Sequence, residues 1–320
     1  MNEYLDLMAD IVEYGHPKND RTGTGTIGLF GQSMSFDLTD GKIPLITTRK
    51  VPWKSFVREM LWFISGSTDI KYLKDNKISI WDNWVIPQTA TYDRSGALSG
   101  GSIGTGAYGA MWRNIEDTRW VSRYDLDTYR KRGFEVLDTC TNQLNFVVRR
   151  KIDQLANAIE LLRTNPDSRR IVVSAWNPAK IDEAVLPPCH TLFQFYSRLP
   201  RDDEKTLGYT KRQLELLIYC RSQDYPIGTV FNIAQYGLLA HMVAQVVDMQ
   251  ASHLTWFGGD VHIYNNQIDL AKEHLERQPT KKKPRIVLNP NINEIDDFKF
   301  EDINIEDYEP LEAINYPIAI

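Results

Sequence analysis

The sequence has few cysteines, no long uninterrupted apolar run and no basic, apolar leader at its amino end. Its three cysteines, Cys140, Cys189 and Cys220, are an odd number without paired spacing, which argues against a disulfide framework and suits a reducing cytosol. No apolar run approaches the roughly 20 residues that cross a bilayer. Residues 1–16 mix acidic residues with apolar ones, unlike a secretion signal. We therefore expect a soluble, cytoplasmic protein without a membrane partner.

Metal-ligand spacing and an excess of positive charge are also absent. No pair of Cys or His residues shows ligand spacing, so we expect no metal. A net charge of -5 and a pI near 5.7 create no field that attracts nucleic acid, and no nucleic-acid partner is expected. The basic run at residues 281–285 is an exception, but most such runs are solvated surface. Any anionic ligand must therefore be held locally.

Ordinary globular patterning fills the rest of the chain. The 320 residues are 42% hydrophobic and 25% charged, enough for a large core. Periodicity predicts helices at the amino end and at residues 55–64, 152–162 and 233–247, the last buried on all sides. It predicts strands at 171–176, 191–196 and 213–219, and one that follows the turn RTGTGTIG and runs through Phe36. This irregular alternation predicts one α+β domain over residues 1–320, with a large mixed sheet flanked by helices and insertions around 85–150 and 199–212.

Cys189 is a candidate nucleophile. It follows Leu186-Pro187-Pro188 at the junction of a proline-fixed turn and a predicted strand, and rigid backbone would hold its thiol in one direction. A buried inert cysteine fits this local setting equally well. His190 is not its obvious base, because neighbours along a strand point to opposite faces.

Arginines stand beside hydroxyl or glycine residues at three element boundaries. They are Arg21 in DRTGTG, Arg169 and Arg170 after NPDS, and Arg221 in CRSQD. Guanidinium groups in such settings bind phosphate, although each alone would more often form a surface salt bridge. Together they predict a monophosphate pocket, and their charge should lower the pKa of a nearby thiol.

Other polar and aromatic residues could recognise a nucleoside. The Asn232 amide could pair with O4 and N3–H of uracil, although a rotated amide suits cytosine and a helix N-cap is the commoner role. His262 and Tyr264 lie two apart, hence on one strand face, and could bind a sugar hydroxyl, unless His262 is a core histidine. Trp81 and Trp84 are either core or a platform for a flat heterocycle. Glu59, desolvated beside them, would have a raised pKa and could move protons.

These segments, in this order, resemble the thymidylate synthase family over nearly the whole chain. The similarity rests on DRTGTGT, LITT, IWDNW, NPDSRRIVVSAWNP, PPCH, FQFY, RSQD, FNIAQYGLLAHMVAQ, GGDVHIYNNQ and the terminal PIAI. It implies a homodimer through the sheet that converts dUMP to dTMP with 5,10-methylenetetrahydrofolate. Relative to the family, the insertions around 85–150 and 199–212 are atypical.

The resemblance also implies roles for individual residues. The implied catalytic set is Cys189, Glu59, Tyr108, Asp224 and Asn232, with Cys189 attacking C6 of the uracil. The implied dUMP-binding set is Arg21, Arg221, Ser222, Asp224, Gly228, Asn232, His262 and Tyr264, with the partner subunit's Arg169 and Arg170 on the phosphate. The implied folate site consists of Arg49, Ile80, Trp81, Trp84, Asp224, Ile227 and Phe231, closed by Ala319 and Ile320.

Three departures from the family pattern fall near these ligands. They are Arg49 in place of lysine, Ile227-Gly228-Thr229-Val230 in place of Leu-Gly-Leu-Pro, and Gly106-Ala107 in place of Pro-Val. The alternatives left open are a dUMP 5-hydroxymethylase, in which water replaces hydride, a catalytically silent nucleotide- or RNA-binding relative, and a cysteine hydrolase. Trp81 and the closing tail favour the synthase, because both would shield a reactive intermediate from water.

Overall fold

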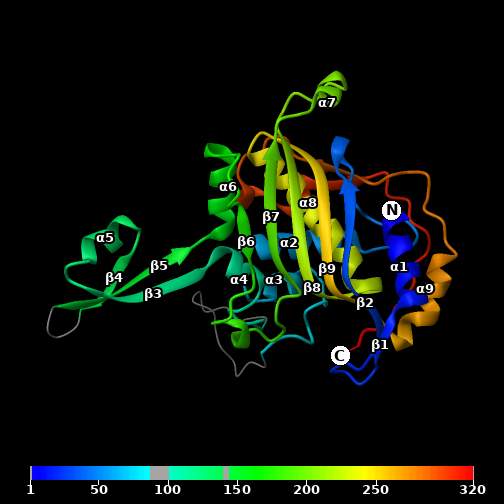
Figure 1. Cartoon of the computed structure of the whole chain (residues 1–320), viewed down its shortest axis with the longest axis horizontal. Coiled ribbons are helices and arrows are strands. Elements are labelled where there is room, and N and C mark those ends of the chain that lie inside the picture. Colours follow the sequence, from blue (N-terminus) through cyan, green and yellow to red (C-terminus); the bar gives the residue numbers. More distant parts are fainter. Residues whose placement is uncertain (1, 87–100, 140–143, 320) are drawn as a thin grey trace.

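A six-stranded mixed sheet forms the body of the protein (Figure 1). The computed structural model describes residues 2–86, 101–139 and 144–319. The strands in spatial order are β1 (His16–Lys18), β2 (Thr26–Asp37), β9 (Gln250–Tyr264), β8 (Gln213–Asp224), β7 (His190–Arg198) and β6 (Val172–Ser174). Neighbouring strands are antiparallel except β8 and β9, which are parallel. The predicted α+β class with a large mixed sheet is confirmed.

Helix α8 (Val230–Val246) packs against the middle of this sheet, where 14 of its 17 residues are buried. The sequence predicts this, because its apolar residues occur all round the helix. The segment Tyr225–Val246 is long and apolar enough to span a membrane, but 72% of its most apolar window is buried inside the fold. It is the core helix of the body.

The other helices surround α8 and the edges of the sheet. α2 (Trp53–Ile64) packs on α8, α4 (Tyr108–Arg113) lies between α2 and α6 (Gln154–Thr164), and α3 (Lys71–Asp75) follows α2. α1 (Asn2–Tyr14) and α9 (Ile268–Leu275) pack together beside β2. The short helix α7 (Asp202–Thr206) occupies the loop between β7 and β8, and β10 (Arg285–Leu288) pairs with β11 (Ile303–Glu306). The predicted elements are present, with bounds shifted by a few residues.

The two faces of the sheet differ in what covers them. Ile218 and Trp256 are paired across β8 and β9 and are fully buried on the face that carries α8. In the next row Tyr219 pairs with Phe257. The Tyr219 side chain is half-buried, and the Phe257 side chain is 41% exposed. In Figure 1, α8 and α2 lie behind the sheet, and this second face is turned toward the viewer. An apolar sheet face therefore remains uncovered within the described chain.

A second, smaller sheet projects from the body (Figure 1). It consists of β3 (Ile115–Ser122), β5 (Asn145–Ile152) and β4 (Glu135–Thr139), all antiparallel, with α5 (Leu126–Lys131) beside them. Its own core is small and contains Val121, Leu126, Phe134 and Val148. These elements fall within the predicted insertion around 85–150, of which residues 87–100 and 140–143, including Cys140, lie outside the described residues. The single-domain division stays a prediction.

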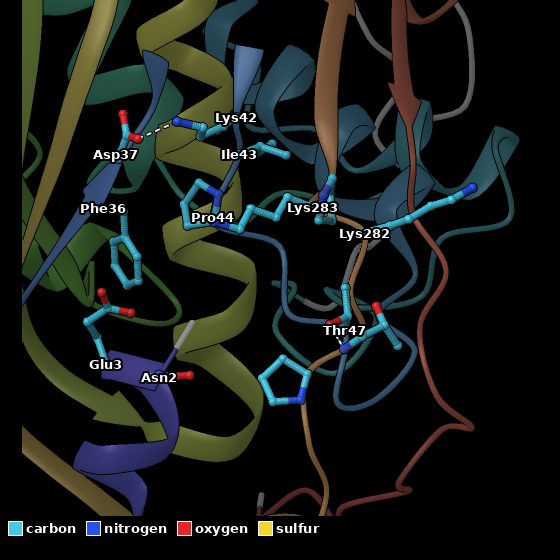
Figure 2. A pocket seen from close by; sticks show the side chains of 13 residues that line it. Asn2, Glu3, Phe36, Asp37, Lys42, Ile43, Pro44, Thr47, Lys282 and Lys283 are labelled. Atoms are coloured by element: carbon cyan, nitrogen blue, oxygen red, sulfur yellow. Dashed lines mark hydrogen bonds and ion pairs between the residues drawn. The ribbon is translucent and has the colours of Figure 1, made fainter. Parts of the chain in front are cut away.

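The basic run at residues 281–285 borders a hollow of about 430 Å³ between the start of α1 and residues 42–47 (Figure 2). Lys282 pairs with Glu309 at 2.7 Å, and Lys42 pairs with Asp37, both of which line the same hollow. Residues 281–283 are exposed. Carboxylates thus offset part of the positive charge, as expected for a solvated surface run.

Candidate active site

A cavity of about 290 Å³ opens beside the ends of β7 and β8 and against α2 and α8. It brings together twelve of the predicted residues: Glu59, Ile80, Trp81, Trp84, Tyr108, Cys189, Ser222, Asp224, Ile227, Gly228, Phe231 and Asn232. Leu186, His190, Gln223, Gln235 and Ile318 complete the lining. The lining is apolar and aromatic with a few convergent polar groups, which is typical of a small-molecule site.

Cys189 stands where the proline-containing loop enters β7. Its backbone N–H donates to the Tyr108 hydroxyl at 2.7 Å. The Arg221 guanidinium donates to the carbonyls of Pro187 at 2.7 Å and Pro188 at 2.9 Å, and its Nη2 lies 4.0 Å from the Cys189 sulfur. Hydrogen bonds to Tyr108 of α4 and to Arg221 of β8 therefore hold the loop that carries the thiol in place.

The charge of Arg221 lowers the pKa of Cys189 as expected, but burial outweighs it. Burial raises the pKa of the thiol above its ordinary value, and the charge of Arg221 and the hydrogen bond with Tyr108 offset only part of that rise. Two proline carbonyls already occupy Arg221, and Arg21, Arg169 and Arg170 are exposed to solvent. The charge of Arg221 therefore stabilises the thiolate by less than the loss of hydration destabilises it.

His190 does not act on Cys189. Its Nδ1 lies 2.7 Å from the Tyr236 hydroxyl, and its ring stacks on Tyr108 with 4.0 Å between the ring centres. Burial lowers the pKa of His190 to about 3, so the ring stays neutral at physiological pH. The prediction that this is not a Cys-His dyad agrees with the geometry.

Glu59 is a buried carboxylate with a hydrogen bond at each oxygen. Trp81 Nε1 donates to Oε1 at 2.6 Å, and Gln235 Nε2 donates to Oε2. Burial raises the pKa of Glu59 to about 7, although both N–H donors favour its ionised form. The raised pKa expected from the sequence is confirmed. Trp81 is both a wall of the cavity and a partner of this carboxylate.

Asn232 lies in the first turn of α8, which begins at Val230, so the N-cap alternative is wrong. Its Nδ2 donates to Gln223 Oε1 at 3.1 Å. A Cβ at Gly228 would lie 2.5 Å from Gln223 Nε2, so the missing side chain makes room for this amide. Its Nδ2 also lies 3.8 Å from the Cys220 sulfur, a weak acceptor, so the carbonyl oxygen of Asn232 is the part of the amide left for a ligand.

Asp224 ends β8 at a single π-helical turn, Tyr225–Thr229, a local irregularity that often marks a functional site. Its carboxylate accepts the Ile227 N–H at 3.3 Å and Gln267 Nε2 at 3.2 Å, and burial raises its pKa to about 6. Gln267 also donates to the carbonyl of Pro317 at 2.9 Å. Asp224 is thereby linked to the C-terminal tail, of which Ile318 lines the cavity.

The tail residues named from the sequence were Ala319 and Ile320. Ala319 is half-buried but does not line the cavity, and Ile320 lies outside the described residues. The tail contact that the structure shows is made one residue earlier than Ala319. The role of Ala319 and Ile320 in closure stays a prediction.

The remaining predicted ligand residues do not line the cavity. The exposed Arg21 guanidinium is 5.7 Å from the centre of the Trp84 ring. Arg169 and Arg170 are exposed between α6 and β6. His262 and Tyr264 share a face of β9 as expected, with 5.2 Å between ring centres, and His262 Nδ1 lies 2.9 Å from Asp260. His262 is also paired in register with Asp224, which places it next to the cavity.

Arg49 is buried behind the cavity, between the π turn and the tail. Its Nη2 donates to the carbonyl of Pro226 at 2.6 Å, and its guanidinium lies 5.4 Å from the centre of the Tyr316 ring. Its Nε has no hydrogen-bond partner among the described residues. The predicted contact of Arg49 with the folate tail stays a prediction.

Gly106, which replaces the usual proline before Tyr108, has a steric reason. A Cβ at this position would lie 1.9 Å from the carbonyl oxygen of Lys180. The segment leading to α4 therefore packs backbone to backbone on the loop that leads to Cys189. A larger residue would force these two segments apart.

Of the lining residues that the sequence did not predict, two are buried amides, Gln223 and Gln235. Gln235 is three residues after Asn232, and that spacing places both on one face of a helix. Gln223 stands between the predicted Ser222 and Asp224. The positions of both residues in the sequence indicate that they lie near the site. A neutral amide is neither a nucleophile nor an acid or base, so its residue type alone does not point to a role in catalysis.

The comparison with known families agrees with this geometry. A family model described as thymidylate synthase matches residues 2–320, nearly the whole chain. Separately, within the described ranges, no group of three or more His, Cys, Asp and Glu side chains could hold a metal ion.

Proposed function

Because the chain belongs to the thymidylate synthase family, we propose that it converts dUMP to dTMP with methylenetetrahydrofolate as carbon and hydride donor. The family supports an enzyme that methylates or hydroxymethylates dUMP with this co-substrate. The observation that supports methylation is Trp81. Its Nε1 is bonded to Glu59, and its ring packs against Tyr108 with 5.9 Å between ring centres, so a fixed indole covers the wall beside Cys189. A water-excluding wall favours hydride over water as the final nucleophile.

The protein groups act on dUMP in a defined order in this proposal. The Cys189 sulfur adds to C6 of the uracil, while Asn232 accepts from N3–H and exchanges its weak contact with the Cys220 sulfur for a bond to O4. Glu59, with a pKa of about 7, can take or give a proton near neutral pH, and Tyr108 assists loss of the C5 proton. Departure of the sulfur from C6 then restores the ring double bond.

The cavity lining fits a flat reduced pterin. Ile80, Trp84, Ile227 and Phe231 supply the apolar surface, and Asp224 supplies a hydrogen-bonding carboxylate at its edge. Methylenetetrahydrofolate would bring the one-carbon unit and the hydride to C5. We propose that the tail from Ile318 onward, with Ala319 and Ile320, closes over this ligand.

We further propose a cytoplasmic homodimer, formed through the uncovered face of the sheet, in which residues 1–320 act as one domain. The exposed apolar row that includes Tyr219 and Phe257 supports this interface, because a stable partner surface should be apolar at its centre. Arg169 and Arg170 are exposed and have no ion pair within the described chain. These two arginines are free to bind the phosphate in the partner's site, together with its Arg21 and Arg221.

The test of the proposed reaction is the identity of the products. The protein is incubated with dUMP and methylenetetrahydrofolate, and the nucleotide and folate products are identified by mass. We expect dTMP with dihydrofolate. Hydroxymethyl-dUMP with tetrahydrofolate would overturn the synthase in favour of the hydroxymethylase.

The binding-only alternative is tested with 5-fluoro-dUMP in the presence of methylenetetrahydrofolate. A covalent adduct on Cys189, located by peptide mass spectrometry, supports catalysis. Its absence from folded protein would favour a silent relative. The cysteine hydrolase has no structural support, since His190 is bonded to Tyr236.

A further inference from the structure

The Glu59 carboxylate is held from two elements at once. Trp81 donates to one oxygen at 2.6 Å, and Gln235, from α8, donates to the other. Glu59 itself is 8% exposed and lines the cavity beside Cys189. Each oxygen thus already accepts an N–H bond before any ligand or water arrives.

The orientation of Gln235 is determined by its surroundings. Its Nε2 lies within hydrogen-bonding reach of Glu59 and is 3.4 Å from the carbonyl oxygen of Phe56. Both neighbours are acceptors, so only the NH2 end of the amide can face them. With 1% exposure and a position in the core helix, Gln235 cannot swing away without leaving Glu59 Oε2 without this donor.

Two fates are open to the proposed intermediate, in which C5 carries an exocyclic methylene and C6 carries the Cys189 sulfur. If hydride adds to the methylene, the C5=C6 bond forms, the thiolate leaves, and the products are dTMP and dihydrofolate. If water adds, its oxygen bonds to the methylene, its proton passes to a base, and the thiolate leaves to give hydroxymethyl-dUMP and tetrahydrofolate. Glu59 is the carboxylate in the cavity nearest to Trp81 and can serve as that base.

We propose that Gln235 is a positioning residue that selects hydride over water, because its N–H occupies one of the acceptor sites with which Glu59 could hold and deprotonate a water beside the methylene. The inference rests on the proposed synthase function and adds a residue that governs its product. Trp81 blocks water by its bulk, whereas Gln235 acts by occupying an acceptor. Both act through the same carboxylate.

Other titratable groups in the cavity behave differently from Glu59. Burial keeps the pKa values of Tyr108 and Tyr236 well above the ordinary value and lowers that of His190 to about 3. Burial raises the pKa of Asp224 to about 6, and that of Cys189 above its usual range, with Arg221 beside it. Because Asp224 titrates close to Glu59, the carboxyl signal of Glu59 is assigned by its disappearance in the Glu59→Gln variant.

The decisive variant is Gln235→Met, which keeps a similar volume but removes the donor. At a pH well above the Glu59 pKa of both proteins, where the carboxylate is ionised, we expect hydroxymethyl-dUMP to rise, as a share of total nucleotide product, at least about tenfold over wild type, the scale of one charge-assisted hydrogen bond. The matched control is Gln245→Met on the same helix. Gln245 donates to the carbonyls of Asn289 at 2.9 Å and Ile292 at 2.8 Å, outside the cavity, so its loss should leave the product ratio unchanged.

A measurement without ligands separates positioning from general damage. The pKa of Glu59, followed by carbon-13 NMR of the carboxyl group, should be higher in Gln235→Met than in wild type, because a donor that stabilises the ionised form is lost. The acid limb of kcat/KM should move to higher pH in parallel. Should Gln235→Met fail to fold, Gln235→Asn, which keeps the amide but is one methylene too short, is expected to show the same shifts.

The outcomes are distinct. If wild type forms hydroxymethyl-dUMP, the proposed function fails. If wild type forms dTMP and folded Gln235→Met forms dTMP with an unchanged product ratio and an unchanged Glu59 pKa, the role of Gln235 is overturned while the synthase stands. A changed ratio in Gln245→Met would also overturn it, because the effect would then be a general one of the helix.

Discussion

The cavity and the projecting sheet treat carboxylates in opposite ways. In the cavity, Glu59 is bonded to neutral N–H donors, and burial raises its pKa to about 7. In the projecting sheet, Asp117 lies 2.7 Å from Arg119 and 3.1 Å from Arg150, which hold its pKa below the ordinary value. Burial without a counter-charge makes ionisation costly, and a paired surface carboxylate avoids that cost. The first arrangement yields a group that can exchange protons near neutral pH, and the second yields only modest stability.

The two regions also differ in how their aromatic residues are held. In the body, Phe63 packs against Trp81, Tyr108 and Trp112 inside a continuous core. In the projecting sheet, Phe134 belongs to a small core and is covered by the Arg150 guanidinium, 4.6 Å from its ring centre. A dense aromatic cluster can fix side chains that act on a substrate, whereas a small core covered by charged side chains mainly keeps a surface element folded.

The largest expected effect is in the cavity, at the nucleophile. Cys189→Ser should lower turnover by at least about 10³-fold, because a hydroxyl is a far weaker nucleophile at neutral pH. Binding of dUMP should remain measurable by calorimetry, since the phosphate and base contacts do not use the sulfur. Turnover close to wild type in this variant would show that Cys189 is not the nucleophile. The cavity would then no longer differ from the projecting sheet in carrying the reaction.

The next effect is on stability and depends on pH. The folded pKa of Glu59, about 7, lies above its unfolded value of 4.5. As pH rises between these values, the unfolded chain ionises first, so Glu59 costs the fold stability and the cost is complete above pH 7. The free energy of unfolding of Glu59→Gln, relative to wild type, should therefore increase by roughly 3 kcal/mol between about pH 4.5 and pH 7.5. Urea titrations at several pH values measure this difference, and a flat profile would show that Glu59 is not desolvated.

The smallest effect is expected for Asp117→Asn in the projecting sheet, with the opposite sign. Its folded pKa is lowered, so the ion pair stabilises the fold above the unfolded pKa and is lost as pH falls. The substitution should cost less than about 1 kcal/mol at neutral pH, because Arg119 is largely solvated. Turnover should not change. A large loss of turnover would show that the projecting sheet is coupled to the cavity.

Periodicity in the sequence was sufficient for most elements of the body. The helices at α2, α6 and α8 and the strands β2, β7 and β8 follow from spacing of apolar residues, because each buries one face or all of them. The π turn at Tyr225–Thr229 and the small core around Phe134 were not predicted. The π turn is held by a distant segment, through the bond from Arg49 to the Pro226 carbonyl, and the small core depends on how β3, β4 and β5 pair, which no local pattern contains.

For the site, the sequence by itself determined which residue types were available and that Cys189, Glu59 and Asn232 belong together. Its motifs carry that information because they match a whole family. The tertiary structure decided how each group behaves. It raised the pKa of Cys189 where arginine charge had been expected to lower it, placed Gln235 on Glu59 and Gln223 on Asn232, and left one face of the sheet uncovered. The physical reason is that desolvation and hydrogen bonding depend on which segments pack together, and only the folded chain specifies that.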